Sequence, residues 1–173
     1  NNAVNEMIND FKSCNSTVAD ISVGIVCFGG YKAEIFNPII SVNEIVSVKM
    51  NANGGTPMGD ALRIAKEIVE DKNIIDGRSY RPTIILVRDG QPNDDWEEDL
   101  DNFIVNGRSA KCHRMSMGIG VAKSTPAYQV LERFAGSSED VFDAKNARDI
   151  RRFFRYVTMS TSARTQSSNP NLI

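Results

Sequence analysis

Two loops of the chain carry side-chain oxygens that suit a hard divalent cation. Thr56 lies in the run GGTPMGDAL at 54–62, and Asp89 lies in the run RDGQP at 88–92. A threonine hydroxyl is a neutral oxygen ligand that Mg²⁺ and Mn²⁺ accept and that zinc disfavours. An aspartate can hold the same ion directly or through a water molecule. If the fold brings the two loops together, they form part of a metal site.

Each loop also has a purely structural interpretation. Thr56-Pro57 makes a good helix start, with threonine as the N-cap and proline at the first helical position. Asp89-Gly90 is a common turn dipeptide. The joint presence of both loops, in this order and on these elements, favours the metal site over two unrelated turns.

Strand and helix patterns alternate along the whole chain and must position these loops. Helices are predicted over 1–13, from 56 to about 75, over 94–105, over 125–134 and over 147–159; strands are predicted over 20–29, 32–36, 81–87, 112–120 and 141–142. Residues 37–52 are predicted as an irregular connection with a short strand or helical turn around 45–48. Asp94-Asp95-Trp96-Glu97 resembles a capping box that opens the helix over 94–105.

This alternation predicts an α/β fold. Its typical form is an open, mostly parallel, doubly wound sheet with helices on both faces. Ligands of such sheets bind at the carboxyl ends of the strands, and both loops lie at such ends. The predicted elements therefore place Thr56 and Asp89 where a ligand is expected.

The composition describes an ordinary globular protein. The 173 residues suffice for one domain with its own core, and we predict that domain over 1–163, followed by a loose polar tail over 164–173. Hydrophobic residues make up 41% and charged residues 24%. The net charge of −2 offers no basic excess, so neither nucleic acid nor an anionic membrane is expected as a partner.

Cysteine usage and apolar runs bear on the compartment. Cys14, Cys27 and Cys112 are widely spaced and form no CxxC pair, so neither a disulfide framework nor a zinc site is predicted. No apolar run approaches the ~20 residues that span a bilayer. The first residues lack the basic start and apolar core of a signal peptide, so we expect a cytoplasmic protein.

Four segments of the chain resemble one family. They are GGTPMGDAL at 54–62, RDGQPNDDW at 88–96, RRFFRYVTMSTSA at 151–163 and the opening NNAVNEMINDF. They are similar to von Willebrand factor A (vWA) domains that carry a metal-ion-dependent adhesion site, or MIDAS. Within that class they resemble the bacterial tellurium-resistance (TerY-like) group. The resemblance covers essentially residues 1–163.

The resemblance implies a non-catalytic function. Thr56 would be a direct ligand of Mg²⁺ or Mn²⁺, and Asp89 a ligand through water. The cation would capture an Asp or Glu side chain of a partner protein, because ligands of low formal charge leave it electrophilic. Part of the rim around the ion would be Gly55, Pro57, Gln91 and Asn93. A role in tellurite or stress resistance is implied by the resemblance alone.

The chain departs from the family in two places. Arg88 stands where the family usually has threonine, although strand alternation should turn its side chain away from Asp89. The Asp-x-Ser-x-Ser segment is absent, together with the central strand that carries it between the strands expected here at about 21–28 and 83–88. We therefore expect the natural protein to continue upstream of Asn1 with this strand. A cation bound by these 173 residues alone should be weak or absent.

Two other functions are compatible with the same loops. The chain could be an enzyme in which Asp89 is a metal-bound carboxylate in phosphoryl transfer, but no nucleophile or general base accompanies it, and no Walker-type glycine loop is present. It could also be a scaffold whose metal site has decayed, which Arg88 favours.

Overall fold

Helices and strands alternate along the chain in the computed structural model, which describes residues 1–14, 20–51, 54–167, 169 and 171. The helices are α1 (Asn2–Cys14), α2 (Met58–Glu70), α3 (Glu97–Val105), α4 (Pro126–Ala135) and α5 (Ala147–Gln166). The strands are β1 (Ser22–Gly29), β2 (Lys32–Ser41), β3 (Thr83–Arg88), β4 (His113–Ile119) and β5 (Val141–Ala144). This order confirms the α/β fold that the sequence predicts.

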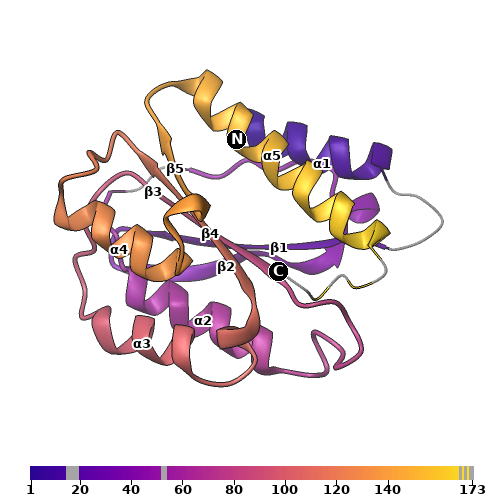
Figure 1. The fold of residues 1–173 in the computed structure, drawn as a ribbon, viewed down its shortest axis with the longest axis horizontal. Coiled ribbons are helices and arrows are strands. Elements are labelled where there is room, and N and C mark those ends of the chain that lie inside the picture. The colour runs from indigo at the N-terminus through magenta and orange to yellow at the C-terminus, as the bar shows by residue number, and fades with distance from the viewer. Residues whose placement is uncertain (15–19, 52–53, 168, 170, 172–173) are drawn as a thin grey trace.

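Helices cover both faces of the strands (Figure 1). α1 and α5 lie together on one face, and α2, α3 and α4 pack on the other. β3, β4 and β5 form a parallel sheet in that order, whereas β1 and β2 form an antiparallel hairpin. The carboxyl ends of the three parallel strands therefore meet at one edge, where the loops after them are placed.

Alternate residues of β3 fill the two halves of the core. Ile85 and Val87 pack into the cluster that α1 and α5 cover, and Ile84 and Leu86 pack into the cluster under α2, α3 and α4. Successive side chains of a strand point to opposite faces, so a strand between two helical layers is apolar throughout. This explains the unbroken apolar run that predicted the strand.

β3 is less buried than its neighbour β4. Met115 and Met117 of β4 are fully buried, whereas Ile85 and Val87 of β3 are half-buried. β4 pairs with a strand on each side, but within the described residues β3 pairs only with β4, and β1 only with β2. β1 and β3 thus each have one edge whose backbone groups no described strand pairs.

The ends of α4 follow the sequence signals. The Thr125 hydroxyl accepts a hydrogen bond from the Tyr128 N–H as the N-cap, and Pro126 begins the helix. Gly136 ends it in the left-handed conformation, with φ of 81°. Both signals act within one turn of the helix, so the sequence alone predicts these boundaries correctly.

β2 is longer than predicted, so the prediction of an irregular connection from residue 37 is wrong. The strand continues to Ser41, which pairs with Ser22, and a short 3₁₀ turn at Val42–Glu44 follows. Pro38 lies within this strand. A proline is tolerated there because β2 pairs on one side only among the described residues.

α5 is also longer than predicted and continues to Gln166. Residues 164–166, predicted to begin a loose tail, belong to this helix. The Arg164 guanidinium donates to Thr83 Oγ1 at 2.7 Å and to the Arg81 carbonyl at 3.1 Å, which anchors the last turn to the start of β3. Within the described part of the chain, no helix combines the length and the apolar character needed to cross a membrane.

The buried thiol of Cys112 makes stability depend on pH in the alkaline range. Burial raises its pKa to about 11, so the folded state keeps the proton that the unfolded chain loses. The stabilisation is complete below the unfolded pKa of about 9 and is lost as the pH rises through the folded pKa. We expect the free energy of unfolding to fall by up to about 2 kcal/mol between about pH 9 and 11. Urea unfolding of Cys112→Ala should lack this decline, and an identical decline in both proteins would contradict the assignment.

Candidate metal site

Asp94, and not Thr56, caps the start of α2. The Asp94 carboxylate accepts hydrogen bonds from the N–H groups of Met58 at 3.1 Å, Gly59 at 2.7 Å and Asp60 at 3.3 Å. Pro57 occupies the N-cap position without a side-chain hydrogen bond. The prediction of Thr56 as N-cap is therefore wrong, because a carboxylate from another loop satisfies the free amides more strongly.

The predicted capping box of α3 is wrong for the same reason. α3 begins at Glu97, and its N-cap residue Trp96 makes no side-chain capping bond. The Asp94 carboxylate, predicted to cap α3, is directed to α2 instead. The loop of residues 89–96 thus ties the end of β3 to the start of α2.

Asn93 holds the backbone of Thr56 from the same loop. Asn93 Oδ1 accepts from the Thr56 N–H at 2.8 Å, and the Asn93 N–H donates to the Thr56 carbonyl at 3.1 Å. The Thr56 side chain is buried, and its hydroxyl makes no hydrogen bond to any described residue. The loop therefore fixes Thr56 in place and leaves its hydroxyl available.

Asp89 directly precedes Gly90, the residue of the second loop that approaches this hydroxyl. It follows β3 directly, is exposed, and has no hydrogen-bond or ion-pair partner among the described residues. A methyl group placed on the neighbouring Gly90 would lie 3.8 Å from Thr56 Oγ1. The structure thus brings together the two loops that carry Thr56 and Asp89.

These two side chains suit a hard cation in type but not in number. Hydroxyl and carboxylate oxygens are the ligands of Mg²⁺ and Mn²⁺, which take six ligands in octahedral geometry. Across the described ranges, no group of three or more His, Cys, Asp or Glu residues could hold a metal ion. Thr56 and Asp89 by themselves therefore offer fewer oxygen ligands than such an ion takes.

The four predicted rim residues lie in different surroundings. Gly55 and Gln91 are exposed beside the two loops. Asn93 is exposed too, but its amide oxygen is occupied by the Thr56 N–H. Pro57 is buried, so its ring is covered at the start of α2. Of the four predicted rim residues, Gly55, Gln91 and Asn93 are thus exposed, and Pro57 is not.

Arg88 lies beneath the site and away from its ligands. Its guanidinium is buried and donates to the Ala127 carbonyl at 2.9 Å, next to Met58 Sδ at 3.5 Å. Arg88 Nε is buried with no partner among the described residues. Burial lowers the pKa of Arg88 to about 10. As predicted from strand alternation, this cation does not contact Asp89 in the structure.

Gly55 is required by a close approach of two loops. Its φ is 78°, and a Cβ there would collide with the carbonyl oxygen of Gly30, whose N–H donates to Gly54. We expect Gly55→Ala to lower the free energy of unfolding by about 1–2 kcal/mol. Gly54→Ala is the matched control, because a Cβ at Gly54 meets nothing within 4 Å. Equal losses in thermal unfolding of the two variants would contradict this role.

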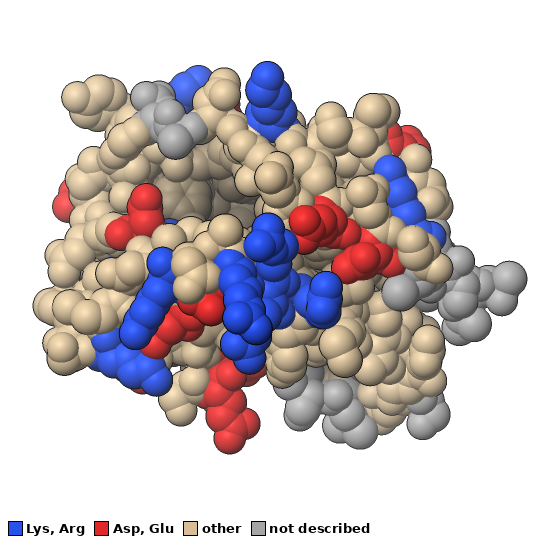
Figure 2. All heavy atoms as spheres, turned by 90° about the horizontal axis from the view of Figure 1, so that it is seen from above, with Lys and Arg blue, Asp and Glu red and all other residues tan. Residues whose placement is uncertain are grey.

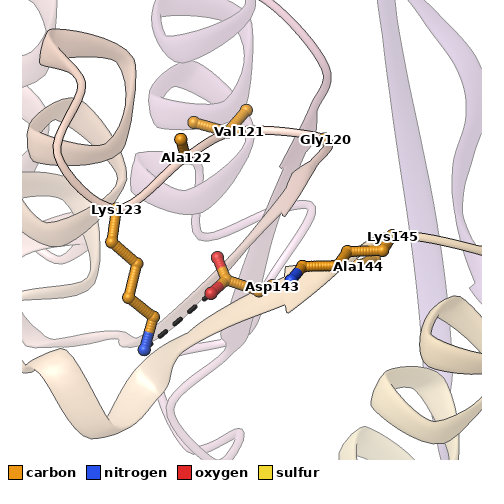
Figure 3. A pocket seen from close by; sticks show the side chains of 7 residues that line it. All are labelled: Gly120, Val121, Ala122, Lys123, Asp143, Ala144 and Lys145. Atoms are coloured by element: carbon orange, nitrogen blue, oxygen red, sulfur yellow. Dashed lines mark ion pairs between the residues drawn. The ribbon is translucent and has the colours of Figure 1, made fainter.

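A second hollow opens at the same edge of the sheet, where β4 and β5 end (Figure 3). It measures about 500 Å³ and is lined by Gly120, Val121, Ala122, Lys123, Asp143, Ala144 and Lys145. Lys123 Nζ lies 3.8 Å from Asp143 Oδ2 across it. Thr56 and Asp89 do not line this hollow, so it is distinct from the candidate metal site.

Solved structures with the same arrangement of elements come from vWA proteins and adhesins. The chain is similar to proximal thread matrix protein 1 from the mussel byssus, at 19% identity and a TM-score of 0.63, over 93% of this chain and 39% of that one. It is similar to a von Willebrand factor type A structure from Catenulispora acidiphila, at 19% identity and a TM-score of 0.61, over 92% and 36%. It is also similar to the pilus adhesin SpaC from Lactobacillus rhamnosus GG, at 12% identity and a TM-score of 0.73, over 91% and 27%.

These likenesses define the class of fold: the chain has the α/β fold of vWA domains, as its loop motifs predict. The mussel protein has also been solved with a zinc-occupied MIDAS motif. The chain spans less than half the length of each of these proteins. No family model matches the chain, and no curated protein matches its sequence.

One residue of the sequence, Gly59, indicates the role of Asp94, although the rules for helix capping do not consider it. Gly59 lies in the first turn of α2, where a glycine lowers the stability of the helix. It is buried. A Cβ there would lie 3.1 Å from Asp94 Oδ2 and 2.8 Å from Asp99 Oδ2. A glycine at this position indicates that another loop packs against the helix start.

Proposed function

We propose that this chain is a non-catalytic protein-interaction module in which a divalent cation captures an acidic side chain of a partner. The observation that carries the proposal is the available hydroxyl of Thr56. Asp94 caps α2 in its place and Asn93 fixes its backbone, so the hydroxyl is left beside the Asp89 loop. Mg²⁺ or Mn²⁺ would be held by Thr56 directly and by Asp89 through water.

The charge of these ligands supports capture of a carboxylate. Thr56 is neutral and Asp89 carries one negative charge, so a bound cation would keep most of its charge for an incoming Asp or Glu. Such a contact is strong when it is partly desolvated. Gly55 and Gln91 would lie beside the captured side chain. The zinc-occupied MIDAS of the structurally similar mussel protein supports a cation at a site of this kind.

We propose further that an extended strand between β1 and β3 completes the site. Each of these strands has one unpaired edge within the described residues, and the side chains of both enter the same two halves of the core. A strand there would cover the half-buried Ile85 and Val87. Its carboxyl end would lie beside Thr56 and Asp89 and could supply the missing oxygen ligands. The Asp-x-Ser-x-Ser strand has this role in the vWA domains that the chain resembles.

Titration with Mn²⁺ of the protein that carries the proposed completing strand tests the ligand assignment. Thr56→Ala and Asp89→Ala should each weaken Mn²⁺ binding by about tenfold or more, measured by electron paramagnetic resonance. Thr56→Ser keeps the hydroxyl and is the matched control, with an affinity near that of the unmodified protein. Equal Mn²⁺ affinity in Thr56→Ala and the unmodified protein would reject Thr56 as a ligand.

Partner binding with and without EDTA separates the three functions. Loss of binding in EDTA and in Thr56→Ala supports metal-bridged capture. Binding that is unchanged by either treatment supports a scaffold whose metal site has decayed. Hydrolysis of a phosphate ester or nucleotide that disappears in Asp89→Asn would support the enzyme instead.

A further inference from the structure

A row of four arginines runs along the exposed face of α5. Arg148, Arg151, Arg152 and Arg155 follow the i, i+3, i+4, i+7 spacing of one helical face, and all four are exposed. We call them the α5 arginine row. The opposite face of the helix is buried and carries Phe153, Phe154, Val157 and Thr158. Figure 2 views the side of the molecule that α1 and α5 cover, and basic side chains gather across it.

The row has no acidic partner inside the described part of the chain. None of its four guanidinium groups makes an ion pair or hydrogen bond with a described residue. Asp149, the acidic residue between them, is engaged elsewhere: Asp149 Oδ2 accepts from the Lys145 N–H at 3.0 Å. The four charges are therefore free for an external ligand.

Within α5 itself, this arrangement gives no electrostatic stabilisation. Like charges spaced three and four residues apart on a helix repel each other. Cations near a helix start also oppose the helix dipole, and the row begins at the second residue of α5. A row that disfavours its own helix indicates a role in binding.

We propose that the α5 arginine row binds an acidic segment of a partner protein. A guanidinium group forms paired hydrogen bonds with a carboxylate, which a row of lysines would not do. The row spans about 10 Å along the helix, the length of three extended residues or two helical turns. Met159 is 67% exposed one turn further along the same face and offers an apolar contact beside the charges.

Two features favour an acidic protein segment over a nucleic acid or an anionic membrane. α1 packs beside α5 and exposes Glu6 and Asp10, and Figure 2 shows acidic side chains next to the basic ones. These carboxylates would repel an extended polyanion that runs past the row. The net charge of −2 also gives no long-range attraction for such a polyanion.

A labelled tetra-glutamate peptide, short enough to lie along the row, provides the probe, and fluorescence anisotropy the readout. The purified protein should bind it, less tightly as salt rises from about 50 to about 300 mM. Changing all four row arginines to glutamine should weaken binding at least about tenfold, while the melting temperature stays the same or rises because the repulsion is gone. The control changes four exposed basic residues outside the row to glutamine: Lys49, Lys72, Arg78 and Lys111.

The affinities of the two variants for the peptide, and of the protein for different anionic ligands, decide whether the proposal holds. Equal affinity of the row variant and the control variant would overturn the proposal, because both lose the same charge. Tighter binding of a ten-nucleotide single-stranded DNA or of phosphatidylserine vesicles than of the peptide would overturn the choice of partner. The row does not include Thr56 or Asp89, so peptide binding should persist in EDTA and in Thr56→Ala. This separates the row from the proposed metal site.

Discussion

Replacing Asp94 with alanine should lower the free energy of unfolding by about 3 kcal/mol. Three N–H groups at the start of α2 lose their acceptor, and the positive end of the helix dipole loses the carboxylate that faces it. In a chain of this size the melting temperature should fall by roughly 6–12 °C. Mn²⁺ binding should weaken as well, although Asp94 is not a predicted ligand, because the loop that fixes Thr56 is loosened.

Asp95 provides a matched control for this change. It is the adjacent carboxylate, it is exposed, and it makes no hydrogen bond to a described residue. Asp95→Ala should therefore change the free energy of unfolding by less than about 0.5 kcal/mol. Asp94→Asn keeps one acceptor oxygen and should lie between the two. Similar losses for Asp94→Ala and Asp95→Ala in urea unfolding would show that the capping role is wrong.

Arg88→Met should raise the free energy of unfolding by about 3 kcal/mol. The Arg88 side chain is only 3% exposed and has no carboxylate partner within the described residues. Its burial lowers the pKa to about 10, a fall that costs the charged form about 3 kcal/mol in the folded state. Methionine has a similar length and suits the neighbouring Met58, so it removes the charge without opening a cavity.

The pH dependence and two control variants sharpen this test. Because the folded pKa of Arg88 is lowered, the cost is present in full below about pH 10 and diminishes as the pH rises above that value. The gain from Arg88→Met should therefore shrink above about pH 10. Arg88→Ala should destabilise the protein through the cavity it leaves, and Arg152→Met, at an exposed position, should have little effect. A destabilised Arg88→Met would contradict the argument.

Features fixed by neighbouring residues could be predicted from the sequence. The strand–helix order follows from apolar periods, and the boundaries of α4 follow from Thr125-Pro126 at its start and Gly136 at its end. The loops that carry Thr56 and Asp89 could also be placed, because both adjoin the ends of predicted elements. In each case the interactions lie within a few residues of the chain.

Features that depend on distant contacts could not be predicted in this way. Thr56 and Asp94 both carry good local capping signals, yet Asp94 caps a helix that begins 36 residues earlier. The last turn of α5 depends on Arg164 reaching β3, 81 residues back in the chain. The polar composition after residue 159 gives no sign of that contact, so the helix was predicted to end too early.

The unpaired edge of β1 also bears on how the protein behaves in concentrated solution. Its sequence, SVGIVCFG, carries no charged residue and no proline. An apolar strand with an open edge recruits other strands, and native proteins avoid this with charges, prolines or a covering element. Because β1 has neither charges nor a proline, only a covering element can protect its edge. The strand proposed to complete the metal site would thus also protect the protein from aggregation. Conditions that release this strand should abolish cation binding and make the protein insoluble.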